Sequence, residues 1–235
     1  MNKGKLYLIP SPLADGQVGD VMPEGTLKIV RRLDFFIVEE IRTARRFLKA
    51  AGTQKKIDDL TFLIFNEHSP ITDLDAFLEP VFSGNDMGLL SEAGLPCVAD
   101  PGAAIVQLAH IKEIQVIPLT GPSSIIMALI ASGFNGQNFS FDGYLPTDRQ
   151  KLRNKIKELE KKIIQQNQTQ IFIETPYRNL RLFEALLAMC QEDILLCIAS
   201  DITGKEEKVQ VKTIKDWKKT KPDIHKKPAI FLLYH

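Results

Sequence analysis

Two loop segments of this chain combine residue types that could bind a small ligand. The first spans residues 89–102 and reads LLSEAGLPCVADPG. An apolar strand ends there in Ser-Glu-Ala-Gly, and Asp100 and Pro101 then have the pattern of a helix start. Such a loop, at the carboxyl end of a parallel strand, lies where open α/β sheets bind ligands. From spacing alone, a ligand site and a rigid connector with a capped helix are equally good interpretations.

The second segment spans residues 116–124 and reads VIPLTGPSS. A strand ends, a tight turn follows at Gly121, and Pro122 opens a predicted helix with two hydroxyl residues behind it. Free N–H groups at a helix start can bind a carboxylate. The alternative is an ordinary cap in which Thr120 or Ser123 satisfies the backbone, so this segment alone is a weak indication.

Several common ligand motifs are absent from the sequence. No Gly-x-Gly-x-x-Gly and no Gly-x-x-x-x-Gly-Lys-Ser/Thr follows a strand, which disfavours a dinucleotide fold and a phosphate-binding P-loop. The turn at residues 10–16, PSPLADG, contains two prolines without N–H groups and cannot cradle a phosphate. The four histidines are scattered and the three cysteines form no Cys-x-x-Cys, so we expect no metal site and three buried thiols.

The elements that would position these loops alternate between strand and helix. Strands are predicted at 6–9, 35–38, 60–65, 88–90 and 115–119, with helices between them. This order predicts a mostly parallel sheet covered by helices. Beyond residue 121, strands at 169–173, 194–199, 209–211 and 229–234 suggest more antiparallel pairing. We therefore predict an α/β protein with two α/β domains, at residues 1–118 and 119–235.

The charge changes sign at the same boundary. Residues 1–118 contain 12 basic and 16 acidic residues, a net charge of −4, whereas residues 119–235 contain 18 and 13, a net charge of +5. A basic C-terminal half, with cationic segments at 149–157 and 205–227, allows a polyanionic partner such as RNA. A solvated helix face is the more frequent explanation of either segment. The sequence has no apolar stretch of membrane-spanning length and no secretory leader, so we expect a cytoplasmic protein without membrane contact.

Together with residues 5–12, KLYLIPSP, and residues 141–146, FDGYLP, the two loops resemble the tetrapyrrole-methylase superfamily. The order and spacing of these four motifs are most similar to the branch that 2′-O-methylates a cytidine of small-subunit ribosomal RNA, and the resemblance extends from about Gly4 to the C-terminus. It implies two α/β domains with S-adenosylmethionine in a cleft between them, a homodimer, and the small ribosomal subunit or its RNA as partner. The residues it implies for cofactor binding are Pro10, Ser91, Glu92, Ala93, Gly94, Asp100, Thr120, Gly121, Pro122, Ser123, Ser124 and Tyr144.

The chain departs from that branch mainly on the presumed substrate side. Glu92 replaces an aspartate of the first loop, and Glu39–Arg42 reads Glu-Glu-Ile-Arg where the branch has Glu-Asp-Thr-Arg. Residues 173–178 read IETPYR in place of Tyr-Glu-Ser-Pro-His-Arg, and residues 200–205 also differ. Cofactor binding is therefore better supported than the identity of the methyl acceptor.

Methyl transfer from a sulfonium is an in-line displacement that depends on alignment and needs no metal. A ribose hydroxyl acceptor would benefit from a nearby base. The candidates for this catalytic role are Glu40, Glu67, His68 and Glu174, for each of which an ion pair or helix cap is the more frequent role. Arg42 and Arg178 could contact RNA phosphates and Tyr177 could stack on a base, although packing explains them equally well.

Two alternatives to an RNA methyltransferase remain at this stage. One is a methylase of a tetrapyrrole or another small acceptor. The other is a non-catalytic protein that binds S-adenosylmethionine or RNA, as the altered substrate-side motifs would allow.

Overall fold

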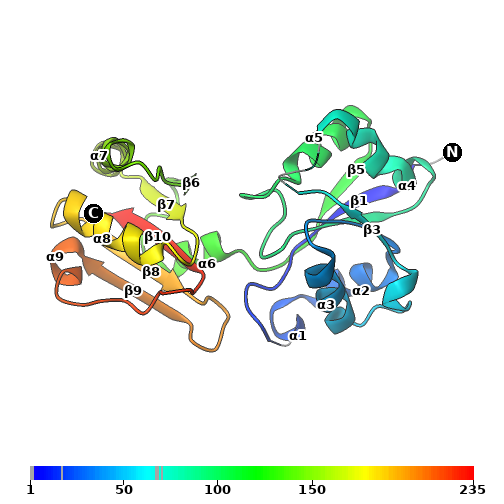
Figure 1. Ribbon diagram of the computed structural model, residues 1–235, viewed down its shortest axis with the longest axis horizontal. Helices are drawn as coiled ribbons and strands as arrows, with labels where there is room; N and C mark the ends of the chain where they lie inside the picture. Colours follow the sequence, from blue (N-terminus) through cyan, green and yellow to red (C-terminus); the bar gives the residue numbers. More distant parts are fainter. Residues whose placement is uncertain (1–2, 17, 67–68, 70) are drawn as a thin grey trace. The chain divides into compact units, whose positions relative to one another are not determined.

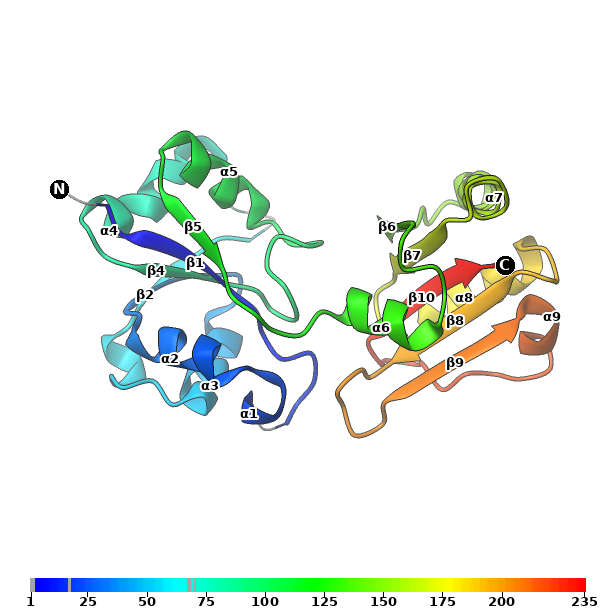
Figure 2. The same ribbon diagram turned by 180° about the vertical axis from the view of Figure 1, so that it is seen from behind.

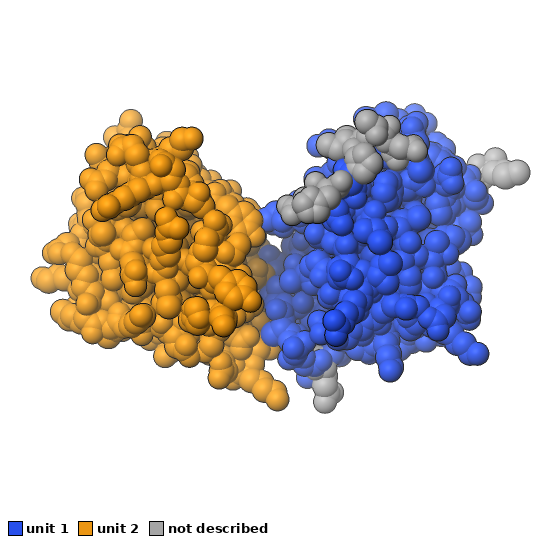
Figure 3. Space-filling model, in the orientation of Figure 1, with its two compact units in different colours: residues 1–123 blue, residues 124–235 orange. Residues whose placement is uncertain are grey.

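The computed structural model describes residues 3–16, 18–66, 69 and 71–235, apart from the side chains of residues 71–73. The chain divides into two compact units, residues 1–123 and 124–235, which Figure 3 colours separately. Each unit contains one five-stranded sheet covered by helices on both faces (Figure 1). No helix in the described ranges is long and apolar enough to cross a membrane.

The sheet of unit 1 is entirely parallel, as predicted, and has the strand order β3-β2-β4-β1-β5. Its strands are β1 (Lys5–Ile9), β2 (Phe35–Val38), β3 (Thr61–Ile64), β4 (Met87–Leu90) and β5 (Gln115–Pro118). Because all five run the same way, their carboxyl ends meet at one edge of the sheet.

Helices cover both faces of this sheet (Figures 1 and 2). Tyr7 and Ile9 point to one face and pack with α2 and α3, whereas Leu6 points to the other and packs with α4 and α5. This alternation follows from the two-residue period of a strand. The helical segments are α1 (Val18–Val21), α2 (Glu24–Arg32), α3 (Ile41–Ala51), η1 (Ile57–Asp59), η2 (Ile71–Leu78), α4 (Glu79–Phe82) and α5 (Ala103–Ile111).

The sheet of unit 2 is mixed, with the order β6-β7-β10-β8-β9. Only β6 and β7 are parallel to each other, and the remaining pairs are antiparallel, which confirms the predicted change of pairing. Its strands are β6 (Phe139–Tyr144), β7 (Thr169–Ile173), β8 (Leu195–Ser200), β9 (Lys208–Thr213) and β10 (Ala229–Tyr234).

One face of this sheet carries α6 (Ser124–Ser132), which packs on β9 and β10. The other face carries α7 (Arg149–Gln166), α8 (Asn179–Met189) and α9 (Ile214–Trp217). Trp217 is fully buried there, donates from its indole nitrogen to the Leu196 carbonyl oxygen at 2.8 Å, and lies edge-on to Phe183. Trp217 therefore stabilises this core, because its large ring is buried while its indole N–H still makes a hydrogen bond.

Two helices begin later than their sequences suggest. Pro101 has a favourable type for a first helical position, yet α5 begins at Ala103 because the Asp100 carboxylate accepts the Gly102 N–H at 2.7 Å and holds a turn before the helix. Likewise α6 begins at Ser124 and not at Pro122. Both prolines therefore belong to the loops that precede the helices.

Candidate functional site

The loops that the sequence singled out in unit 1 all leave the carboxyl edge of the parallel sheet. Pro10 follows β1, Glu39 follows β2, Ser91 follows β4 and Leu119 follows β5. β2 and β4 are neighbours, and the chain leaves them in opposite directions, toward β3 and β5 respectively. A crevice at such a point is where open α/β sheets bind ligands. We refer to residues 10–11, 91–94 and 120–123 as the loop cluster.

Hydrogen bonds join the first two loops of the cluster. Ser11 and Gly94 exchange two backbone hydrogen bonds, with N···O distances of 2.9 and 3.0 Å. The Ser11 hydroxyl donates to the Ser91 carbonyl oxygen at 2.6 Å, and the Ser91 hydroxyl donates to the Gly94 carbonyl oxygen at 2.7 Å. Both serine side chains are buried. The Ser91 hydroxyl is therefore used within the loop, where it fixes the path of the backbone.

The backbone conformation at position 94 requires glycine. Its φ is +74°, and a Cβ atom there would lie 3.2 Å from Leu13 Cδ2. For a residue with a side chain, this left-handed conformation is unfavourable by about 1–2 kcal/mol. Further along the same loop, Cys97 and Ala99 adopt φ values of 67° and 55°. Left-handed residues other than glycine persist only where their surroundings impose them, and such strain clusters at ligand sites.

Gly121 lets the third loop approach the first. A Cβ atom on Gly121 would lie 2.4 Å from Pro10 Cβ, closer than any real contact. The Thr26 hydroxyl donates to the Thr120 carbonyl oxygen at 2.7 Å and holds the loop from the side of α2. The Thr120 residue itself is exposed. The structure thus brings Pro10 and Gly121 into contact, two residues that are 111 positions apart in the sequence and were predicted to share one site.

Two carboxylates lie near each other beside these loops. Glu40 caps α3 and accepts the Arg42 N–H at 2.9 Å. Partial burial raises the pKa of the Glu92 carboxyl above its ordinary value and the Glu40 carboxylate adds to the rise, whereas hydrogen bonds from Thr43 and the Glu40 backbone, and the charge of Arg46, lower it. Glu92 therefore reaches across to the start of α3, where the charge of Arg46 partly offsets that of the two carboxylates.

We expect Glu92→Gln to stabilise the fold slightly at pH 7. A carboxyl whose pKa is higher in the folded than in the unfolded state favours folding below its unfolded pKa, and that contribution is lost as the pH rises through the folded pKa. The ionised side chain is therefore unfavourable at pH 7, and glutamine removes the charge while retaining the shape. Thermal unfolding should give a slightly higher Tm for the variant at pH 7 and an equal Tm near pH 4. A lower Tm for the variant at pH 7 would contradict this assignment of Glu92.

Cys190 and Cys197 are buried, as predicted, whereas Cys97 is only partly buried. Burial raises the pKa of Cys97 to about 11, with a contribution from Asp100, and burial raises the pKa of Cys197 to about 12. The pKa of Cys190 is raised to about 12 by burial and by Glu160. The three thiols are thus protonated at neutral pH and are poor nucleophiles. Among the described residues, no three His, Cys, Asp or Glu side chains are grouped as metal ligands.

In unit 2, the parallel strands β6 and β7 bring a second group of predicted residues to one sheet edge. Tyr144 pairs with Ile173 in the ladder, so Tyr144 and Glu174 end their strands side by side. Tyr144 is 55% exposed, and Tyr177 is 74% exposed with the Lys226 ammonium 5.8 Å from its ring centre. Both aromatic rings are therefore accessible to a ligand.

Glu174 holds Arg178 rigidly. Its Oε1 atom accepts from the Thr175 N–H at 2.6 Å and from Arg178 Nη2 and Nε at 2.6 and 3.0 Å. The Glu174 side chain is only 7% exposed, whereas that of Arg178 is 39% exposed. The arrangement fits a carboxylate that positions a partly exposed guanidinium.

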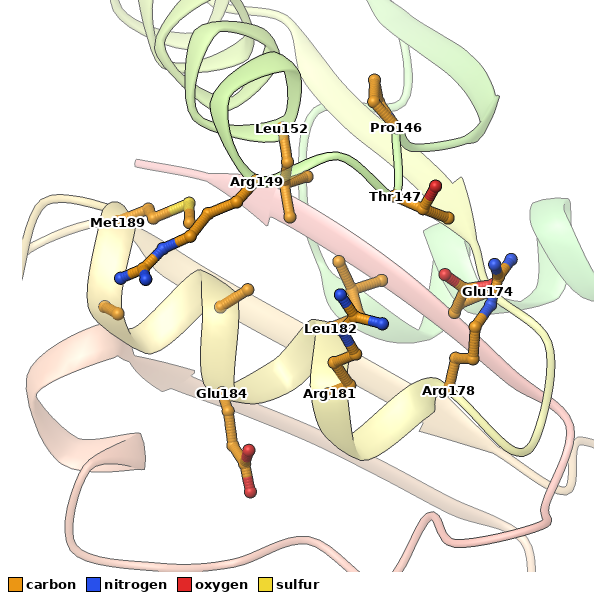
Figure 4. A pocket seen from close by; sticks show the side chains of 12 residues that line it. Pro146, Thr147, Arg149, Leu152, Glu174, Arg178, Arg181, Leu182, Glu184 and Met189 are labelled. Atoms are coloured by element: carbon orange, nitrogen blue, oxygen red, sulfur yellow. The ribbon is translucent and has the colours of Figure 1, made fainter.

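A pocket of about 280 Å³ lies beside this pair, between α7 and α8 (Figure 4). We call it the α7–α8 pocket. Its floor is apolar, and Arg181 extends from α8 into it while Arg149 lies beside Met189 (Figure 4). Glu184 points away from the cavity. Its lining residues are Pro146, Thr147, Arg149, Leu152, Glu174, Arg178, Arg181, Leu182, Glu184, Ala185, Ala188 and Met189.

The predicted site residues thus fall into distinct groups. Most of the predicted cofactor residues lie in the loop cluster, Asp100 is a turn residue before α5, and Ser124 and Tyr144 belong to unit 2. Arg42 is exposed at the start of α3, beside the cap formed by Glu40. Glu67 and His68 lie outside the described residues. The sequence did not indicate Arg181, which lines the same pocket as Arg149 because α7 and α8 pack on the same face of the sheet.

Proteins named ribosomal RNA small subunit methyltransferase I are similar to this chain over most of its length. That of Vibrio cholerae is 28% identical over 233 residues, covering 98% of this chain and 76% of that protein. That of Halalkalibacterium halodurans is 30% identical over 200 residues, which cover 83% of this chain and 64% of that protein.

Among solved structures, the methyltransferase CobJ has a TM-score of 0.67 and 16% identity, covering 99% of this chain and 94% of that one. The uroporphyrin-III-C-methyltransferase of Thermus thermophilus has a TM-score of 0.59 and 15% identity, with the same coverage. The chain matches no family model.

The solved structures establish the fold, and the sequence relatives, matched along almost the whole chain, establish the class: this chain is a methyltransferase. These matches confirm the resemblance of the chain to the tetrapyrrole-methylase superfamily, nearest its ribosomal-RNA branch.

Proposed function

We propose that this chain transfers a methyl group from S-adenosylmethionine to a ribose 2′-hydroxyl of small-subunit ribosomal RNA, acting as a cytoplasmic homodimer. The observation that carries the proposal is the loop cluster, in which residues from three parallel strand ends are fixed against one another. The names of the sequence relatives support ribosomal RNA as the acceptor.

The loop cluster fits this cofactor chemically. Ala93 is small and exposed beside the fixed Gly94 turn, so a ligand can approach the backbone there. The backbone N–H groups at the start of α6, which begins at Ser124, would bind the carboxylate of the methionine moiety. Glu40 and Glu92 place two carboxylates beside the loop cluster, and a nearby negative charge would favour the sulfonium of the cofactor. When bound, S-adenosylmethionine supplies the electrophilic methyl carbon.

The acceptor side is assigned to residues at strand and helix ends. Arg42 and Arg178 would contact RNA phosphates, and Tyr177 would stack on a base. Because Glu174 Oε1 already accepts three hydrogen bonds, we assign Glu174 a positioning role through Arg178. A general base, where the reaction uses one, would then come from Glu40, Glu67 or His68.

Calorimetry tests the cofactor assignment directly. We expect S-adenosylmethionine and its demethylated product to bind with one site per chain, and with the same affinity in the presence of a chelator, because no step requires a metal. The control is adenosine alone, which should bind more weakly because it lacks the methionine carboxylate. If neither cofactor form binds at millimolar concentration, the assignment of the loop cluster is wrong.

Two other results of a methyl-transfer assay would assign the chain a different function. Label transferred from methyl-tritiated cofactor to a tetrapyrrole, and not to RNA, would assign the chain to small-acceptor methylases. Cofactor binding without transfer to either acceptor would assign it a non-catalytic binding role.

A further inference from the structure

A row of cations extends along α7 from the α7–α8 pocket. Its members follow one another at four-residue intervals, so that they form one ridge of the helix, and all are exposed. With a rise of 1.5 Å per residue, successive members are about 6 Å apart along the axis, and the row is about 18 Å long. The row consists of Arg149, Arg153, Lys157 and Lys161.

The row differs from Lys155 and Lys162 of the same helix, which are both ion-paired. Lys155 pairs with Asp142 at 3.0 Å and with Glu158, and Lys162 pairs with Glu158 at 2.7 Å. By contrast, no described carboxylate lies within ion-pair distance of any member of the row. The positive charges of the row are not balanced by carboxylates of the described chain, whereas those of Lys155 and Lys162 are. This difference indicates a surface that binds an anionic partner from outside the chain.

The pocket at the N-terminal end of the row adds a second feature. Arg149 belongs to both, and Arg181 enters the same cavity from α8 (Figure 4). A guanidinium binds a phosphate with two parallel hydrogen bonds and also stacks on a base. The apolar floor formed by Leu152, Leu182 and Ala185 can accept the face of a base beside that phosphate.

We propose that the α7–α8 pocket binds one nucleotide of a single-stranded RNA segment, and that the row on α7 binds the phosphates that follow it. This inference deepens the proposed function, since it assigns the surface that holds the RNA. The linear spacing of the row fits a repeating anion, and the pocket fits a nucleotide better than the side chain of an acidic protein. Arg149 and Arg181 are binding residues, distinct from the loop cluster in unit 1.

The test measures binding of the full-length protein to a fluorescent, unstructured RNA 12-mer without cofactor, at several salt concentrations. We expect Arg149→Gln/Arg181→Gln and Arg153→Gln/Lys157→Gln each to weaken binding by about tenfold or more. Each double variant should also reduce the slope of log K against log salt by about 1.4, as expected for two lost phosphate contacts to a single strand. Thermal unfolding should be unchanged, because these side chains are exposed.

Matched controls remove two exposed lysines elsewhere. Lys28→Gln/Lys49→Gln, on helices of unit 1, should bind RNA as the wild type does, and so should Lys205→Gln/Lys221→Gln in the other basic segment of unit 2. The proposal is overturned if both double variants, Arg149→Gln/Arg181→Gln and Arg153→Gln/Lys157→Gln, retain wild-type affinity. It is also overturned if only Lys205→Gln/Lys221→Gln loses affinity, or if polyglutamate displaces the RNA as effectively as unlabelled RNA does. Because the assay needs no methyl transfer, a wild type that binds RNA through this surface but transfers no label would refute the proposed function and leave this inference standing.

Discussion

Replacing Gly121 by valine should reduce the affinity for S-adenosylmethionine by about 100-fold or more, equivalent to about 2.7 kcal/mol. The first added carbon would lie 2.4 Å from Pro10 Cβ, and the Pro10 ring cannot rotate out of the way. The loops after β1 and β5 must then separate, which also lowers the free energy of unfolding by about 1–3 kcal/mol. Calorimetry and thermal unfolding measure the two effects separately.

The control for this variant is Gly25→Ala in the same unit. A Cβ atom on Gly25 meets nothing within 4 Å, and the residue lies in α2, where alanine is favoured over glycine. Gly25→Ala should therefore bind the cofactor normally and unfold at an equal or higher temperature. Normal cofactor affinity in a folded Gly121→Val protein would show that contact between these two loops is irrelevant to binding.

Removing the Glu174 side chain should lower the rate of methyl transfer to RNA by about 100-fold, the cost of misplacing a reacting group by roughly 1 Å. Glu174→Ala releases Arg178 from the two hydrogen bonds that orient its guanidinium. Glu174→Gln should be milder, because the amide oxygen can still accept from Arg178 and from the Thr175 N–H. Cofactor affinity should be unchanged in both variants.

The pH profile separates positioning from proton transfer in this experiment. If Glu174 only orients Arg178, Glu174→Gln keeps the shape of the wild-type profile with a lower rate. If Glu174 accepts the proton, the same variant loses the acidic limb of the profile, and the positioning role is wrong. Glu192→Gln, which removes an exposed carboxylate paired with Lys218, is the control and should behave as the wild type.

The parallel sheet and its loops were predictable because they depend on local patterns. Apolar runs separated by amphipathic segments specify a parallel sheet. Parallel strands place Pro10, Ser91 and Thr120 at one edge of that sheet, irrespective of the order of the strands. The conformation of each loop was not predictable. The exchange of hydrogen bonds between Ser11 and Gly94 joins residues 83 positions apart, and nothing local in either segment specifies it.

The acceptor side was less predictable for a similar reason. The basic character of residues 149–157 is visible in the sequence, yet the α7–α8 pocket exists only because α7 and α8 pack side by side on one sheet face. Glu174 was a candidate base by type and position. Its engagement with Arg178 depends on the turn after β7, where the backbone brings the two side chains together.

The most direct test of the account is a nucleotide-resolution map of ribose methylation in small-subunit ribosomal RNA from cells with and without the gene. We expect that one 2′-O-methyl group disappears with the gene and returns when the wild-type chain is expressed, but not when Gly121→Val is expressed. An identical map in both strains would contradict it.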